Sequence, residues 1–166
     1  MFACSLPRPS LGQVWTTWAT RHAAARQQRI AVEGFDREAQ RRVVEANMRH
    51  AAMCGSAARG VGQAKQFFNR APENSAYDPF TAGFLARNLS GFADRFRSVP
   101  FEGLPPELVV PVINAAAYLG ELEAVLLAIP GESPRSSLQI DMQDHTIERT
   151  LKFFLAEEAQ ATERAS

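Results

Sequence analysis

Cysteine and lysine are scarce in this 166-residue chain, and each scarcity excludes a class of protein. The two cysteines, Cys4 and Cys54, are too few for a disulfide framework and lack the close pairing of a zinc site. We therefore expect a reducing, cytoplasmic setting. The lysines are Lys65 and Lys152. The glycine-rich segment at residues 55–62 has neither the lysine nor the preceding strand of a phosphate-binding loop.

Catalytic patterns are also missing. There is no Gly-x-Ser-x-Gly motif of a hydrolase and no Glu-x-x-His motif of a di-iron bundle. Glu121 and Glu123 lie two residues apart, so they point to different sides of a helix. We predict that the chain is not an enzyme and needs no cofactor. The most apolar segment, residues 108–129, contains these two carboxylates and Pro111, which argues against a membrane span.

What the chain does have is a long helical pattern at residues 10–68. Pro9 and Ser10 are typical of a helix start, and no proline follows before Pro72. Apolar and small side chains recur every three or four residues, as in a helix that lies against a partner helix. We predict an interaction face that includes Trp15, Trp18, Val32, Phe35, Val43 and Met53. Gly34 and Gly60 are the positions where this helix is most easily bent or broken.

Three shorter helices are predicted after this arm, at residues 78–98, 106–129 and 144–163. Asp78 and Pro79 open the first of them as N-cap and N1, and Asp144 is expected to cap the last. Residues 130–143 are expected to be an extended loop. The predicted fold class is therefore all-α with four main helices. It divides into an N-terminal loop at 1–9, a helical arm at 10–70 and a helical body at 71–166, which together form a single domain.

The charges are unevenly distributed, although the net charge of the chain is zero. Residues 1–70 carry a net charge of +7 and the remainder carries −7. A basic arm joined to an acidic body suggests that the two halves attract each other within one chain or between chains. Contacts to phosphate or to an acidic partner are predicted from exposed arginines of the arm, namely Arg21, Arg29, Arg37, Arg41, Arg42 and Arg49.

His50 and Cys54 form the one local pattern that suggests a metal. They lie four residues apart on one helical face, and this spacing can supply two ligands. No third or fourth ligand is spaced nearby. We therefore interpret them as a histidine in the helix seam and a small buried thiol, and we predict no bound metal.

These features favour a non-enzymatic helical interaction or scaffold protein that self-associates through the long N-terminal helix. Two alternatives remain open: an amphipathic coat on an apolar granule or membrane surface, and a regulatory protein that binds nucleic acid through arginines. Nucleic acid is the less favoured partner, because Glu33, Asp36, Glu38 and Glu45 are interleaved with the arginines. Residues 33–42, with the sequence EGFDREAQRR, resemble a helix of the phasins, small helical proteins that coat polyester granules. That resemblance implies the coat function.

Overall fold

The structure is a computed structural model. It describes the backbone at residues 11–70, 79–128 and 137–166, and side chains at residues 20–70, 80–128 and 140–166. The chain divides into two compact units, unit 1 at residues 1–42 and unit 2 at residues 43–166. Because α1 spans the division, its two parts are described separately below.

Four helices account for nearly all the described residues. They are α1 (Leu11–Arg70), α2 (Pro79–Arg97), α3 (Pro106–Leu127) and α4 (Ser137–Ala165). The described residues contain no strand. The all-α prediction with a long first helix is confirmed. Both Gly34 and Gly60 are helical, and α3 begins at Pro106 and continues through Pro111.

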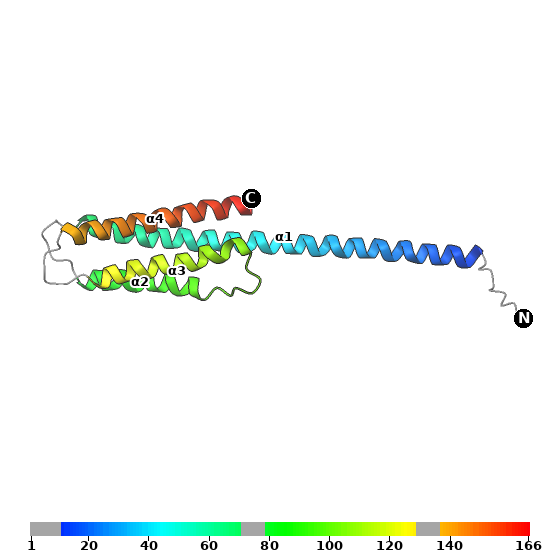
Figure 1. Ribbon diagram of the computed structural model, residues 1–166, viewed down its shortest axis with the longest axis horizontal. Coiled ribbons are helices and arrows are strands. Elements are labelled where there is room, and N and C mark those ends of the chain that lie inside the picture. Colours follow the sequence, from blue (N-terminus) through cyan, green and yellow to red (C-terminus); the bar gives the residue numbers. More distant parts are fainter. Residues whose placement is uncertain (1–10, 71–78, 129–136) are drawn as a thin grey trace, which may run out of the picture. The chain divides into compact units, whose positions relative to one another are not determined.

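Within unit 2, successive helices run in opposite directions (Figure 1). The cross-helix pairs agree with this arrangement. On α1 and α4, Lys65 pairs with Glu148 and His50 lies near Glu157. The later residue of α1 thus lies beside the earlier residue of α4, as expected for antiparallel neighbours. The four helices thus form an up-down-up-down bundle.

Small side chains let these helices approach closely. The buried positions of α1 between Cys54 and Ala64 are mostly glycine and alanine, and those of α3 are mostly leucine, so that small and large residues interdigitate across the bundle. A Cβ added at Gly60 would lie 2.8 Å from the ring of Phe92 on α2, so this glycine is needed for the α1–α2 contact. The central core residues are Cys54, Ala57, Val61, Ala64, Phe68, Leu85, Leu89, Phe96, Val112, Leu119, Leu122, Ile147 and Phe154.

The connection between α2 and α3 is a tight, anchored turn. The amide of Leu104 donates a hydrogen bond to the carbonyl of Phe101 at 3.2 Å, and Gly103 has φ of 77°. An i to i+3 bond with a positive φ at the third residue is the pattern of a type II turn, which favours glycine there. Val99 and Leu104 pack against the core on either side. The tip between them, Phe101 and Glu102, is exposed.

The start of the last helix was predicted wrongly. Helix α4 begins at Ser137, so residues 137–143 are helical, and Asp144 lies inside the helix instead of capping it. The buried face of α4 includes two polar residues, Gln143 and Thr150. Because these positions are polar, the apolar repeat that marks a helix is weak across residues 137–150, and the first turns resemble a loop in sequence.

Helix α3 is not buried on all sides. Leu108, Val112 and Leu119 point into the bundle, whereas Val110 and Ile113 are more than half exposed. Leu127 is also exposed. By length and composition alone, α3 is the one helix among the described residues that is apolar enough to span a membrane. The buried leucines show that one of its faces belongs to the core of unit 2.

Candidate functional site

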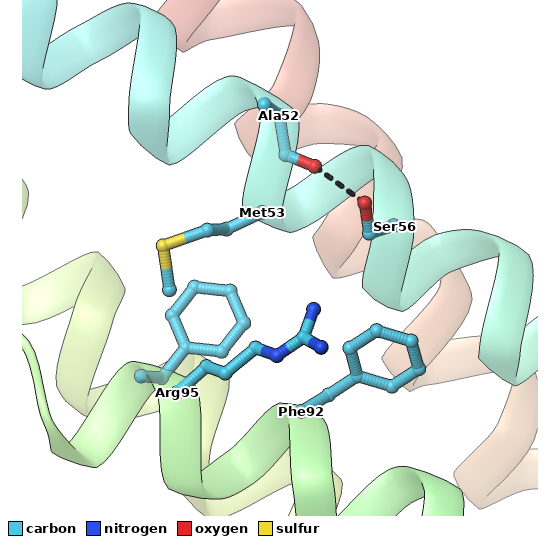
Figure 2. Close-up of a pocket in the computed structure, with 6 residues that line it drawn as sticks. Ala52, Met53, Ser56, Phe92 and Arg95 are labelled. Atoms are coloured by element: carbon cyan, nitrogen blue, oxygen red, sulfur yellow. Dashed lines mark hydrogen bonds between the residues drawn. The ribbon is translucent and has the colours of Figure 1, made fainter.

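A groove runs between α1 and α2 in unit 2, and its apolar end is a pocket of about 180 Å³. Figure 2 shows Met53 reaching from α1 toward the α2 side chains that face it. The hydroxyl of Ser56 donates to the carbonyl of Ala52 at 2.8 Å, so this wall is held by α1 itself. The residues that line the pocket are Ala52, Met53, Ser56, Phe92, Arg95 and Phe96. Such a pocket has room for one apolar side chain.

The other end of the groove is polar and basic, with a volume of about 550 Å³. Its lining contains three arginines and no carboxylate: Ser56, Arg59, Gly60, Gln63, Arg87, Asn88, Gly91, Phe92 and Arg95. Arg59 donates to the hydroxyl of Ser56 at 3.1 Å, and the guanidinium of Arg95 lies 5.5 Å from the centre of the Phe92 ring. Arg59, Arg87 and Arg95 form no ion pair with any described carboxylate, so their charge is available to a ligand.

A buried polar cluster lies on the α4 side of the same helix α1. His50 Nε2 is 3.5 Å from Glu157 Oε2 and 3.5 Å from Cys54 Sγ. The imidazole of His50 is 3% exposed, and its ring packs edge to face against Phe96. His50 Nδ1 is buried without a hydrogen-bond partner in the described structure. This favours the tautomer whose proton is on Nε2, which can then donate to the carboxylate of Glu157.

Burial controls the protonation of both groups in this cluster. Burial lowers the pKa of His50 below its usual 6.5, and it outweighs the opposing attraction of Glu157. The folded state therefore holds the neutral ring, and the unfolded state binds the extra proton first as the pH falls below 6.5. This group consequently reduces stability in that acidic range and has no such effect above it. Burial, with Glu157 and Glu158 adding to it, raises the pKa of the Cys54 thiol to about 12.

The cluster does not form a recognisable metal centre. Among the described residues there is no group of three or more His, Cys, Asp or Glu side chains that could hold a metal ion. His50 and Cys54 do lie together, as the spacing predicted, and both are buried on α1. A protonated thiol is a poor metal ligand, since the thiolate is the form that binds. The site is therefore a buried polar cluster in which His50 Nδ1 and Glu157 Oε2 have no hydrogen-bond partner within the described structure.

The predicted interaction face is divided between the two units. In unit 1, Val32 and Phe35 are 59% and 81% exposed. In unit 2, Val43 is 39% exposed, and Met53 is partly buried at the edge of the core. The side chains of Trp15 and Trp18 lie outside the described residues, although their backbone belongs to α1.

The predicted contact arginines are all exposed on α1. Arg41 and Arg42 both pair with Glu38, each at 3.2 Å. The other four, Arg21, Arg29, Arg37 and Arg49, have no ion pair to a described carboxylate. Of the expected charge pairing between the halves of the chain, the described residues show Lys65 with Glu148.

Sequence reasoning missed two parts of this region. Arg87 and Arg95 are eight residues apart on α2, and they meet Arg59 only because α1 and α2 are neighbours. Glu157 comes from α4, and its half-buried position beside His50 was not predicted. The available signal was the i, i+4 spacing of Arg87, Gly91 and Arg95, which puts a glycine between two cations on one helical face.

Comparison of the chain with protein-family models, with curated proteins and with solved structures found no match. Function is therefore inferred from the residues and geometry of the chain itself.

Proposed function

We propose that the protein is a non-enzymatic helical interaction or scaffold protein that self-associates through the part of α1 in unit 1. The supporting observation is the exposure of Phe35, Val32 and Ile30 at 81%, 59% and 63%. From Thr20 to Arg42 every described side chain is exposed except Glu38, which is half-buried. This stretch therefore has no core of its own. A single helix gains most of its stability from packing an apolar face, so a second copy of the helix is the natural partner.

The test is a Val32→Ser/Phe35→Ser double variant, studied by sedimentation across a concentration series. Burial of one such side chain contributes about 1.5–3 kcal/mol to the free energy of association, and each 1.4 kcal/mol changes the dissociation constant about tenfold. The dissociation constant for self-association should therefore rise at least about tenfold. Phe84→Ser on α2 is the matched control, because Phe84 is also exposed but lies in unit 2. A double variant that associates as tightly as the unmodified protein contradicts the proposal.

A second candidate function, a coat on an apolar granule or membrane surface, is favoured by the outer face of α3. Val110, Ile113 and Leu127 are 61%, 52% and 64% exposed, although the opposite face of α3 is in the core. An amphipathic helix with such a face binds the boundary between headgroups and acyl chains. On this hypothesis the protein should float with neutral phosphatidylcholine vesicles, and Val110→Ser/Ile113→Ser should reduce the bound fraction several-fold. Val32→Ser/Phe35→Ser should leave it unchanged. Absence of flotation would remove this candidate.

A further inference from the structure

The turn between α2 and α3 presents a feature that the fold itself does not need. Phe101 is 54% exposed, and it is followed by the exposed Glu102. Val99 and Leu104 hold the turn to the core, and Gly103 sets its bend. An apolar ring and a carboxylate are therefore displayed side by side on a rigid support. Glu102 forms no ion pair with any described residue.

The groove between α1 and α2 has the complementary chemistry. Its apolar pocket, lined by Met53, Phe92 and Phe96, has room for one aromatic side chain. Beside it lie the cations of Arg87 and Arg95, without a carboxylate in the lining. Gly91 opens onto the same end, and a Cβ added there would meet no atom within 4 Å. An apolar pocket beside positive charge is chemically complementary to an exposed aromatic ring beside a carboxylate.

The two features are also neighbours on the surface. Arg95 and Phe96 lie in the last turn of α2, which ends at Arg97, and the turn follows directly after it. An isologous dimer uses the same patch on both copies, so a projection and its complementary groove must lie close together on each. A two-fold axis through this patch would bring the Phe101–Glu102 turn of each copy to the groove of the other copy.

We propose that two copies of the chain pair about such an axis, with Phe101 of each copy in the α1–α2 pocket of the other and Glu102 against the other copy's Arg95 and Arg87. This contact rests on the proposed self-association but uses unit 2, whereas the contact proposed above uses unit 1. An experiment can therefore exclude either contact without excluding the other. Opposite charges that meet in the contact also determine its orientation and increase its rate of formation.

A charge exchange tests the pairing. In full-length protein carrying Val32→Ser/Phe35→Ser, which removes the contact through unit 1, two variants are prepared: Glu102→Arg and Arg95→Glu. Either variant by itself forms dimers in which like charges meet at both contacts. The dissociation constant of such a dimer should be at least tenfold higher than that of the parent. An equimolar mixture should associate again. In the mixed dimer, one contact joins Arg at 102 to Glu at 95 and the other keeps the original pair.

Sedimentation and cross-linking of differently tagged copies measure the result. Both substituted residues are exposed, so far-UV circular dichroism should be unchanged. Recovery in the mixture supports the pairing and cannot arise from misfolding. If either variant dimerises like its parent, or if the mixture is no tighter than the separate variants, the proposal is wrong. A parent that stays monomeric but binds a short DNA through Arg95 also overturns it.

A steric test uses two glycines of the same helix. Gly91→Leu fills the groove, whereas Gly83→Leu adds the same side chain to α2 outside the groove. A Cβ at either position meets no atom within 4 Å. Both variants should gain helix stability to a similar extent. Loss of dimer in Gly91→Leu alone supports the proposal, and equal dimerisation of the two variants refutes it.

Discussion

Phe154→Ala should lower the free energy of unfolding by about 3–5 kcal/mol. Phe154 is fully buried on α4, and its ring centre is 5.8 Å from that of Phe96 on α2. Phe96 in turn packs edge to face against His50 of α1. The rings of Phe154, Phe96 and His50 therefore connect α4, α2 and α1. Truncation removes the contacts of the ring with Phe96 and Phe153 and leaves a cavity in the core. A loss of this size is a large part of the 5–15 kcal/mol that typically stabilises a domain.

Urea unfolding followed by circular dichroism measures this loss. The matched control is Phe84→Ala. Because Phe84 is half exposed on α2, this substitution should lower the free energy of unfolding by well under half as much. If Phe154→Ala does not fold, Phe154→Leu retains most of the volume and should show a smaller loss in the same direction. Equal effects of Phe154→Ala and Phe84→Ala would mean that α4 is not packed against α2 in this way.

The thiol of Cys54 should be nearly inert toward thiol reagents in the folded protein. Burial and the nearby carboxylates of Glu157 and Glu158 raise its pKa from 9.0 to about 12. The thiolate is the reactive form, so its fraction at pH 8 falls on the order of a thousandfold. The same shift makes stability decline as the pH rises above 9, because the unfolded chain then loses the proton that the folded chain retains.

The rate of reaction with a chromogenic disulfide at pH 8 measures this effect in a Cys4→Ser variant, with and without denaturant. The unfolded protein supplies the reference rate for an ordinary thiol. Glu157→Gln should change the native rate by much less than unfolding does, because burial is the main cause of the shift. Reaction at the unfolded rate in native buffer would show that Cys54 is not sealed between α1 and α4.

The fold class and three of the four helices were predictable because prolines mark their limits, whereas the predicted caps Ser10 and Asp78 lie outside the described residues. The faces of the helices were less predictable. On α2, the large side chains of Phe80 and Phe84 are exposed, whereas the buried face combines Leu85, Leu89 and Phe96 with Ala82, Ala86 and Ala93. Alanine has little hydrophobic weight in a sequence pattern, but it permits the close helix contact from which the bundle gains its packing.

The candidate sites were predictable only where they lie on one helix. The spacing of His50 and Cys54 placed both on one face of α1, and they are in contact. Their third neighbour, Glu157, comes from α4, and no local pattern links it to them. The arginines of the groove were not predictable as a group for the same reason. Arg59 and Arg87 become neighbours only through the packing of α1 on α2. A single sequence shows periodicity within a helix, but it does not show which helices are adjacent.

The up-down-up-down order has a consequence for synthesis of the chain. Helices α2 and α3 are neighbours both in sequence and in space, so their pairing closes a short loop and costs little entropy. The pairing of α1 with α4 joins distant residues, such as Lys65 and Glu148, which are 83 positions apart. Because a ribosome releases α4 last of the four, α1 can pack on α2 during translation, but its α4-facing side stays uncovered until α4 is made. Until α4 is in place, the side of Cys54 that α4 covers is open to oxidants.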